Sequence, residues 1–190
     1  RSGGVFLTRF RNIHDAAMTK AIDLLIRARW IIPVEPANTV LEHHALAVCD
    51  GRIVDLLPER DAAERYVAAR ETRLDRHVLL PGLVNLHCHA AMSLLRGLAD
   101  DTPLMTWLQD HIWPAEGRHV SPEFVHDGTL LACAEMLRGG ITCFNDMYFF
   151  PTAAAAAVRE AGMRAVIGLP LLEFPTAYAT DADDYLAKGL

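Results

Sequence analysis

The sequence predicts an α/β chain in which a small, mainly β unit precedes alternating strands and helices. Apolar residues stand at every second position over 22–34, which is typical of a half-buried strand. Asp50 and Gly51 separate two short apolar arms, a pattern that favours a β-hairpin. After Pro81, apolar strands alternate with helical stretches, which indicates a parallel sheet covered by helices.

Individual elements are predicted from periodicity and from the residues that begin or end helices. Ser121 and Pro122 open a long helix and Gly139-Gly140 ends it, because serine caps helices well and glycine terminates them. Thr102 and Pro103 are predicted to open an earlier helix in the same way. The other predicted elements are a helix over 61–69, strands over 74–80, 141–147 and 164–172, a helix over 152–161 and a helix begun before Leu190.

Composition and charge exclude several classes of protein. The chain has 190 residues, 52% of them hydrophobic, and a formal net charge of −6 from 18 basic and 24 acidic residues. This balance argues against a nucleic-acid partner, and no apolar run approaches the roughly 20 residues that span a bilayer. The four cysteines form no C-x-x-C pair, which indicates free thiols in a reducing compartment. We therefore expect a cytoplasmic protein that contacts neither nucleic acid nor membrane.

Residues 1–20 are predicted to stand outside the fold. The chain begins with Arg1, and this stretch holds four basic residues against a single acidic one, Asp15. A start that contains arginine and few acids is compatible with a transit peptide. The alternative that we favour is a tail or appended extension upstream of a natural start near Met18.

The residues with the clearest chemical meaning are His87 and His89. They end an apolar stretch over 78–86 that Pro81-Gly82 interrupts. On a strand, residues two apart face the same side, so both imidazoles are predicted to project together and Cys88 to project away. Two imidazoles at a strand end suit a metal ion. The alternative, from spacing alone, is a pair of ordinary histidines near a strand end.

Four segments together resemble the amidohydrolase superfamily, in particular its branch of 5-methylthioadenosine/S-adenosylhomocysteine deaminases. In chain order they are PGLVNLHCH (81–89), AMSLLRGLAD (91–100), WPAE (113–116) and GITCFNDMY (140–148). The segments occur in the family's order and at its spacing, and the resemblance covers residues 22–190.

The resemblance implies the N-terminal part of a metal-dependent-hydrolase (β/α)8 barrel, preceded by part of a small β-sandwich domain. Residues 21–80 would belong to the sandwich, and residues 81–190 would supply the first strands and helices of an incomplete barrel. Active sites on such barrels lie at the carboxyl ends of the strands, where His87 and His89 would end the first strand. The resemblance implies that they bind one divalent metal, in the first place Zn2+, with Fe2+ and Ni2+ as alternatives.

Two further residues are expected to contact the substrate. By resemblance, Glu116 matches a family glutamate that binds ribose hydroxyls, and a carboxylate suits two neighbouring hydroxyl donors. Trp113 would supply an apolar wall for a base or a thioether. The alternatives are a surface carboxylate at a helix end and a core tryptophan.

Other polar and apolar residues receive structural interpretations. Arg96 is expected in an ion pair, and Asp146 is expected to anchor a strand end by hydrogen bonds, with a place behind the metal as the alternative. Met92 is expected in the core. Three histidines are expected at the surface: His111, His119 and His126.

By resemblance, the activity is deamination of an adenosine-type nucleoside, 5-methylthioadenosine or S-adenosylhomocysteine, to the inosine analogue and ammonia through a metal-activated water. One alternative is another hydrolase of the superfamily: a guanine deaminase, a cytosine deaminase or a triazine chlorohydrolase. The other is a non-catalytic fragment that needs a complementary chain.

The resemblance also implies that residues 1–190 do not supply the whole active site. No histidine follows His126, so the remaining metal ligands and the general acid and base are expected outside this chain. No catalytic residue is therefore assigned within it, and the chain by itself is expected to be inactive. Assembly into a homo-oligomer stays open.

Overall fold

The computed structural model describes residues 19–190, which fall into two units that meet at Pro81 and Gly82. Each unit is described by itself. Of the predicted tail, residues 1–18 lie outside the described range, and Lys20 already belongs to the first strand. Within residues 19–190, no helix combines the length and the apolar character needed to cross a membrane.

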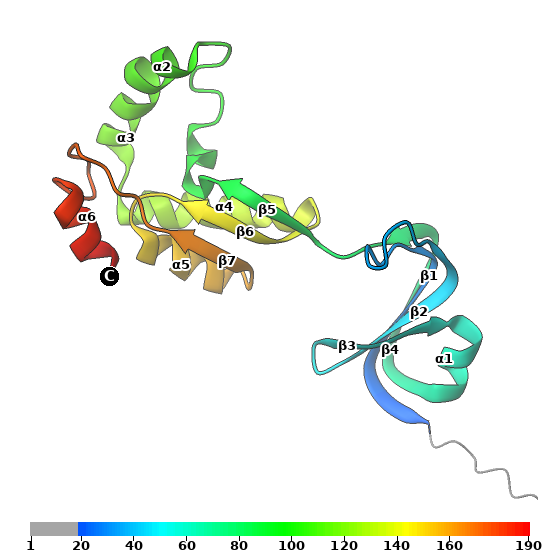
Figure 1. Ribbon diagram of the computed structural model, residues 1–190. Helices are drawn as coiled ribbons and strands as arrows, with labels where there is room; N and C mark the ends of the chain where they lie inside the picture. Colours follow the sequence, from blue (N-terminus) through cyan, green and yellow to red (C-terminus); the bar gives the residue numbers. More distant parts are fainter. Residues whose placement is uncertain (1–18) are drawn as a thin grey trace, which may run out of the picture. The chain divides into compact units, whose positions relative to one another are not determined.

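The first unit is built on a four-stranded sheet with the order β3-β2-β1-β4 (Figure 1). β1 pairs antiparallel with β2 and parallel with β4, and β2 pairs antiparallel with β3. The helix α1 connects β3 to β4 and buries Ala62 in the core of the unit. The bounds are β1 Lys20–Ile31, β2 Leu41–Cys49, β3 Arg52–Pro58, α1 Glu59–Arg65 and β4 Tyr66–Leu79.

The hairpin predicted at Asp50-Gly51 is confirmed. Both turn residues have positive φ, 51° at Asp50 and 68° at Gly51, as a type I′ turn requires. Glycine adopts such angles without a steric cost. Cys49 and Arg52 therefore pair directly across the turn.

The prediction that every second residue of 22–34 faces the core was wrong. The buried apolar residues of β1 are spaced by three: Ile22, Leu25, Ala28 and Ile31 are all at most 4% exposed. An irregularity in the pairing of β1 with β4 between Ala28 and Trp30 shifts the alternation over the last residues of the strand. The strand also ends at Ile31, before the apolar alternation does.

The second strand of the parallel pair, β4, is longer than predicted. The helix that was expected over 61–69 ends at Arg65. From Tyr66 onward the chain instead pairs along the whole length of β1, beginning with Lys20 opposite Tyr66. Pairing with a distant strand therefore decides the structure of 66–69, against the helix propensity of its alanines.

The second unit contains three parallel strands in the order β5-β6-β7, as predicted. Their bounds are β5 Leu83–Cys88, β6 Ile141–Met147 and β7 Arg164–Gly168. The helices α4 (Pro122–Arg138) and α5 (Pro151–Glu160) lie on one face of this sheet (Figure 1). The buried cluster between them consists of Ala90, Ala132, Cys133, Met136, Phe144, Val158 and Met163.

Four short helical segments connect β5 to α4: the 3-10 helix η1 (Ala90–Leu95), α2 (Leu104–Thr106), the π-helical η2 (Trp107–Ile112) and α3 (Trp113–His119). The predicted cap at Thr102 was wrong, because the residue that precedes α2 is Pro103, in extended conformation and without a capping hydrogen bond. The cap at Ser121 is confirmed: its hydroxyl accepts a hydrogen bond from the backbone N–H of Phe124 at 3.1 Å.

The strand predicted over 164–172 is shorter than expected, because β7 ends at Gly168. A loop over 169–181 follows and leads into α6 (Ala182–Gly189). Within the second unit, α3 and α6 lie beyond the carboxyl ends of the strands (Figure 1). This is the edge of the sheet at which the predicted site residues gather.

Candidate active site

The two predicted metal ligands face each other at the end of β5. His87 lies within the strand and His89 follows it directly. Their ring centroids are 5.0 Å apart, and the ring planes meet at 85°. Cys88 is half-buried and packs against the core cluster that contains Phe144. Strand alternation therefore sets both imidazoles apart from the thiol between them, as expected.

His89 is oriented by the neighbouring strand. Its Nδ1 atom lies 2.7 Å from the backbone carbonyl oxygen of Met147, at the end of β6. A carbonyl oxygen can only accept, so Nδ1 carries the proton and Nε2 keeps its lone pair. A hydrogen bond of this kind behind a metal-binding histidine fixes both its tautomer and its ring orientation.

Asp146 anchors the backbone next to His89, which was the favoured interpretation. Its Oδ1 atom accepts a hydrogen bond of 2.8 Å from the backbone N–H of Ala90, and the side chain is only 1% exposed. Burial raises the pKa of this carboxyl, and hydrogen bonds from the backbone of Ala90 and Met147 oppose that rise. The end of β6 thus holds both the ring of His89 and the chain that follows it.

The donor set suits a divalent metal such as zinc, for which imidazole nitrogen is a common ligand. His89 offers Nε2, and His87 lies on the same side of the strand end. Cys88 packs into the core cluster, away from both imidazoles, and burial and the nearby Asp146 raise the pKa of its thiol to about 11. The fit is therefore to two neutral nitrogen ligands from this part of the chain.

Glu116 and Trp113, both on α3, share a cavity of about 490 Å³ with His89. Apart from His89, Glu116 and the hydroxyl of Tyr148, the wall is apolar. Its remaining residues are Met92, Leu104, Trp107, Leu108, Ile112, Met147, Phe149, Pro170, Leu172 and Phe174. The two predicted substrate contacts and one predicted metal ligand are therefore brought to one hollow.

Tyr148 holds the carboxylate of Glu116 in place: its hydroxyl donates a hydrogen bond of 2.7 Å to Oε1. Burial raises the pKa of Glu116, while the hydrogen bond from Tyr148 and the nearby His89 oppose the rise. Burial also raises the pKa of Tyr148. A half-buried, bonded carboxylate does not fit the alternative of a surface residue at a helix end.

The loop over 169–181 supplies one wall of the cavity. Its Pro170, Leu172 and Phe174 line the space. The ring of Phe174 lies 5.7 Å from the ring of Trp113, at an angle of 52°. Trp113 is 39% exposed, so it stands at a cavity wall rather than in the core.

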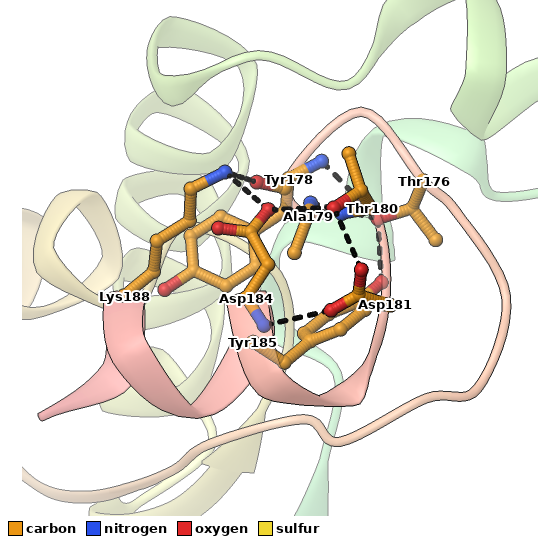
Figure 2. Close-up of polar contacts among 8 residues, drawn as sticks. All are labelled: Thr176, Tyr178, Ala179, Thr180, Asp181, Asp184, Tyr185 and Lys188. Atoms are coloured by element: carbon orange, nitrogen blue, oxygen red, sulfur yellow. Dashed lines mark hydrogen bonds and ion pairs between the residues drawn. The ribbon is translucent and has the colours of Figure 1, made fainter.

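Helix α6 fastens this loop through a polar network (Figure 2). One oxygen of Asp184 accepts hydrogen bonds from the backbone N–H of Thr180 at 2.9 Å and from Lys188 at 2.8 Å. The hydroxyl of the fully buried Tyr185 lies 2.5 Å from that of Thr176. The helix therefore ties down the far end of the loop that carries Phe174.

Two other interpretations from the sequence agree with the structure, and the second of them needs widening. Arg96 makes the expected ion pair, with two hydrogen bonds of 2.9 and 2.6 Å to Glu135. Met92 packs against a core cluster as expected and in addition lines the cavity. Sequence reasoning did not single out Tyr148 or Phe174. Tyr148 belongs to one of the recognised segments, but its contact with Glu116 spans 32 residues.

The amidohydrolase family model matches residues 78–188 of this chain, which include both histidines and the cavity. The chain belongs to the amidohydrolase family. This amidohydrolase is 55% identical over 168 residues to the 5-methylthioadenosine/S-adenosylhomocysteine deaminase of Saccharophagus degradans, covering 88% of this chain and 38% of the relative. It is 47% identical to the deaminase of the same name from Teredinibacter turnerae, covering 90% of this chain and 39% of that relative. The chain thus spans less than two fifths of the length of these relatives.

Solved structures agree with the fold. An adenosine deaminase from Xanthomonas campestris with bound zinc superposes with a TM-score of 0.87 at 52% identity, covering 90% of this amidohydrolase and 39% of that chain. An atrazine chlorohydrolase from Arthrobacter aurescens, complexed with zinc, gives a TM-score of 0.72 at 19% identity. The match covers 87% of this amidohydrolase and 41% of that chain. The predicted fold class is confirmed: a mainly β unit is followed in the chain by part of an amidohydrolase (β/α)8 barrel.

Proposed function

We propose that the protein containing this chain is a metal-dependent deaminase of adenosine-type nucleosides such as 5-methylthioadenosine and S-adenosylhomocysteine. The observation that carries the proposal is the 55% identity over 168 residues to a deaminase of that name. The site geometry supports it, because the imidazole of His89, the carboxylate of Glu116 and an apolar wall share one hollow. Such a hollow suits a ligand with an apolar body and a few polar groups.

The proposed roles follow from the chemistry of each side chain. His87 and His89 would hold one divalent metal, with zinc favoured because the Xanthomonas campestris relative contains it. When bound, a divalent metal lowers the pKa of water to about 7 and so supplies a nucleophile at neutral pH. Glu116 would accept hydrogen bonds from the ribose hydroxyls, and Trp113 would pack against the base or the 5′ substituent.

The second candidate class, a guanine deaminase or a triazine hydrolase, has weaker support. An Escherichia coli guanine deaminase is 20% identical with a TM-score of 0.68, and a triazine hydrolase from Arthrobacter aurescens is 21% identical with a TM-score of 0.74. Likeness at this level reflects the fold alone. The adenosine-type assignment therefore takes precedence over both.

The test is an ammonia-release assay on the full-length, zinc-loaded protein that contains this chain. We expect ammonia release from 5-methylthioadenosine, S-adenosylhomocysteine or adenosine, no ammonia from guanine and no chloride from atrazine. A zinc-loaded protein that releases no ammonia from any purine nucleoside would contradict the proposal. Residues 1–190 alone should show no turnover, because two imidazoles fall short of the three protein ligands typical of a hydrolytic zinc site.

We also propose that the protein acts in the cytoplasm on small molecules, without nucleic acid or membrane. The support is that all four cysteines are free thiols, the state expected in a reducing compartment. Cell fractionation with an antibody against the natural protein checks the location. Whether it forms a homo-oligomer is settled by light scattering on the full-length protein.

A further inference from the structure

Tyr148 joins the metal-binding side of the cavity to the substrate-binding side. It directly follows Met147, whose carbonyl oxygen accepts the hydrogen bond from His89. Its own hydroxyl donates to Oε1 of Glu116 at 2.7 Å. Two consecutive residues at the end of β6 therefore set the positions of a proposed metal ligand and of a proposed ribose contact.

The surroundings of Tyr148 make it a rigid support. The side chain is only 6% exposed and packs in a buried cluster with Ala91 and Val125. Burial and the adjacent Glu116 raise the pKa of its phenol, so it stays protonated and acts as the donor. Glu116, by contrast, lies on a helix of seven residues that follows an irregular π-helical segment.

The hydrogen bond leaves a defined part of Glu116 for a ligand. Oε1 receives the phenol proton, whereas Oε2 has no hydrogen-bond partner among residues 19–190. An ionised carboxylate can accept several hydrogen bonds. Because Tyr148 fixes the position of Oε1, the orientation of Oε2 is fixed as well, and Oε2 remains able to accept from a ligand. The cavity that Glu116 lines is the space into which a ligand hydroxyl would enter.

We infer that Tyr148 is a positioning residue, which orients the Glu116 carboxylate for recognition of the paired hydroxyls of a ribose. The inference deepens the proposed function and rests on it. Neither a contact with the metal nor a contact with the reacting carbon is assigned to Tyr148. It would act through Glu116: by fixing the carboxylate relative to the end of β6, it would hold the ribose in one orientation.

The experiment compares Tyr148→Phe with the parent enzyme, full-length and zinc-loaded, on adenosine and on 3′-deoxyadenosine. We expect the KM for adenosine to rise about tenfold, equal to about 1.4 kcal/mol, with kcat changed less than about threefold. The KM for 3′-deoxyadenosine should change less than about threefold, because that substrate lacks one of the two hydroxyls. A role in packing alone would affect both substrates alike.

Two further variants make the result specific. Glu116→Gln should raise the KM for adenosine, and Tyr148→Phe should add little in that background, because both changes disturb one unit. Tyr66→Phe is the matched control: its hydroxyl donates to Asp55 at 2.9 Å, in the first unit of the chain. It loses the same kind of hydrogen bond, and both kinetic constants should stay at the parent values.

The outcomes separate the inference from the proposed function. If Glu116→Gln raises the KM for adenosine but Tyr148→Phe does not, the inference is overturned while the deaminase proposal stands. Equal losses on both nucleosides in Tyr148→Phe also overturn it. If the parent enzyme deaminates no nucleoside, the proposed function itself fails.

Discussion

The Nδ1 atom of His89 lies 2.7 Å from the carbonyl oxygen of Met147, so β6 orients a side chain that follows β5. Parallel neighbours end at the same edge of a sheet, which is why the last carbonyl of one can meet the first side chain beyond the other. The contact leaves Nε2 as the nitrogen with a free lone pair. It thereby gives the metal-site proposal a definite donor atom.

The first prediction concerns metal binding by the two histidines. His87→Ala and His89→Ala, each in the full-length protein, should weaken zinc binding at least about tenfold, because each removes a ligand. Zinc content after dialysis against a graded chelator, measured by mass spectrometry, checks this. His119→Ala on the exposed surface of α3 is the control and should keep the parent zinc content. Full zinc occupancy in either ligand variant would remove that histidine from the site.

Local patterns were sufficient for much of the fold. The turn at Asp50-Gly51, the cap at Ser121 and the alternation of parallel strands with helices depend on neighbouring residues, and all are confirmed. The juxtaposition of His87 and His89 also follows from a period of two along one strand. Each of these features is encoded within a few residues, where sequence reasoning is strongest.

The features that sequence missed depend on contacts between distant segments. Residues 66–69 join β4 because they pair with β1, more than 40 residues earlier in the chain. The loop over 169–181 is as apolar as a strand at its start, but its Pro170, Leu172 and Phe174 line a cavity instead of pairing in the sheet. The bond between Tyr148 and Glu116 likewise has no local signature.

The second prediction concerns the contact between α4 and η1. A Cβ atom on Gly128 would lie 2.5 Å from the carbonyl oxygen of Ala91, a backbone atom that cannot give way cheaply. Gly128→Ala should therefore lower the free energy of unfolding by about 1–3 kcal/mol. Thermal or urea unfolding of the full-length protein measures this.

Gly117→Ala is the matched control for Gly128→Ala. Gly117 is also helical, but nothing lies within 4 Å of its would-be Cβ atom. Alanine stabilises a helix interior relative to glycine by up to about 1 kcal/mol. The two variants should therefore shift the melting temperature in opposite directions. A neutral or stabilising Gly128→Ala would show that η1 does not pack on α4 as described.

The third prediction concerns the loop that carries Phe174. Asp184→Ala removes the acceptor shared by Thr180 and Lys188, so the loop should lose its tie to α6 (Figure 2). Because the loop lines the cavity, we expect the KM for the nucleoside to rise about two- to tenfold with little change in kcat. Asp183→Ala, at an exposed position in the same helical turn, is the control. Equal KM values for both variants would show that the tie does not influence the cavity.

The fourth prediction concerns the pH dependence of an ion pair between α4 and α5. The ring of His126 lies 3.0 Å from Asp127 through Nδ1 and 3.3 Å from Glu160 through Nε2. The hydrogen bond to Asp127 makes the largest contribution to the pKa of His126, and Glu160 contributes further. Together they raise this pKa above its ordinary value of 6.5. A raised pKa means that the folded state binds the proton more tightly than the unfolded state.

The sign of the effect follows directly. The stabilisation is fully present below the ordinary pKa of 6.5 and is lost as the pH rises through the higher pKa of the folded state. His126→Gln should therefore lower the melting temperature at about pH 5.5 and leave it close to the parent value at about pH 9. Glu160→Gln should reproduce part of the loss at low pH, because only the partner on α5 is removed. A melting-temperature difference that is constant across this range, or larger at high pH, would exclude a protonated His126 as the link between the two helices.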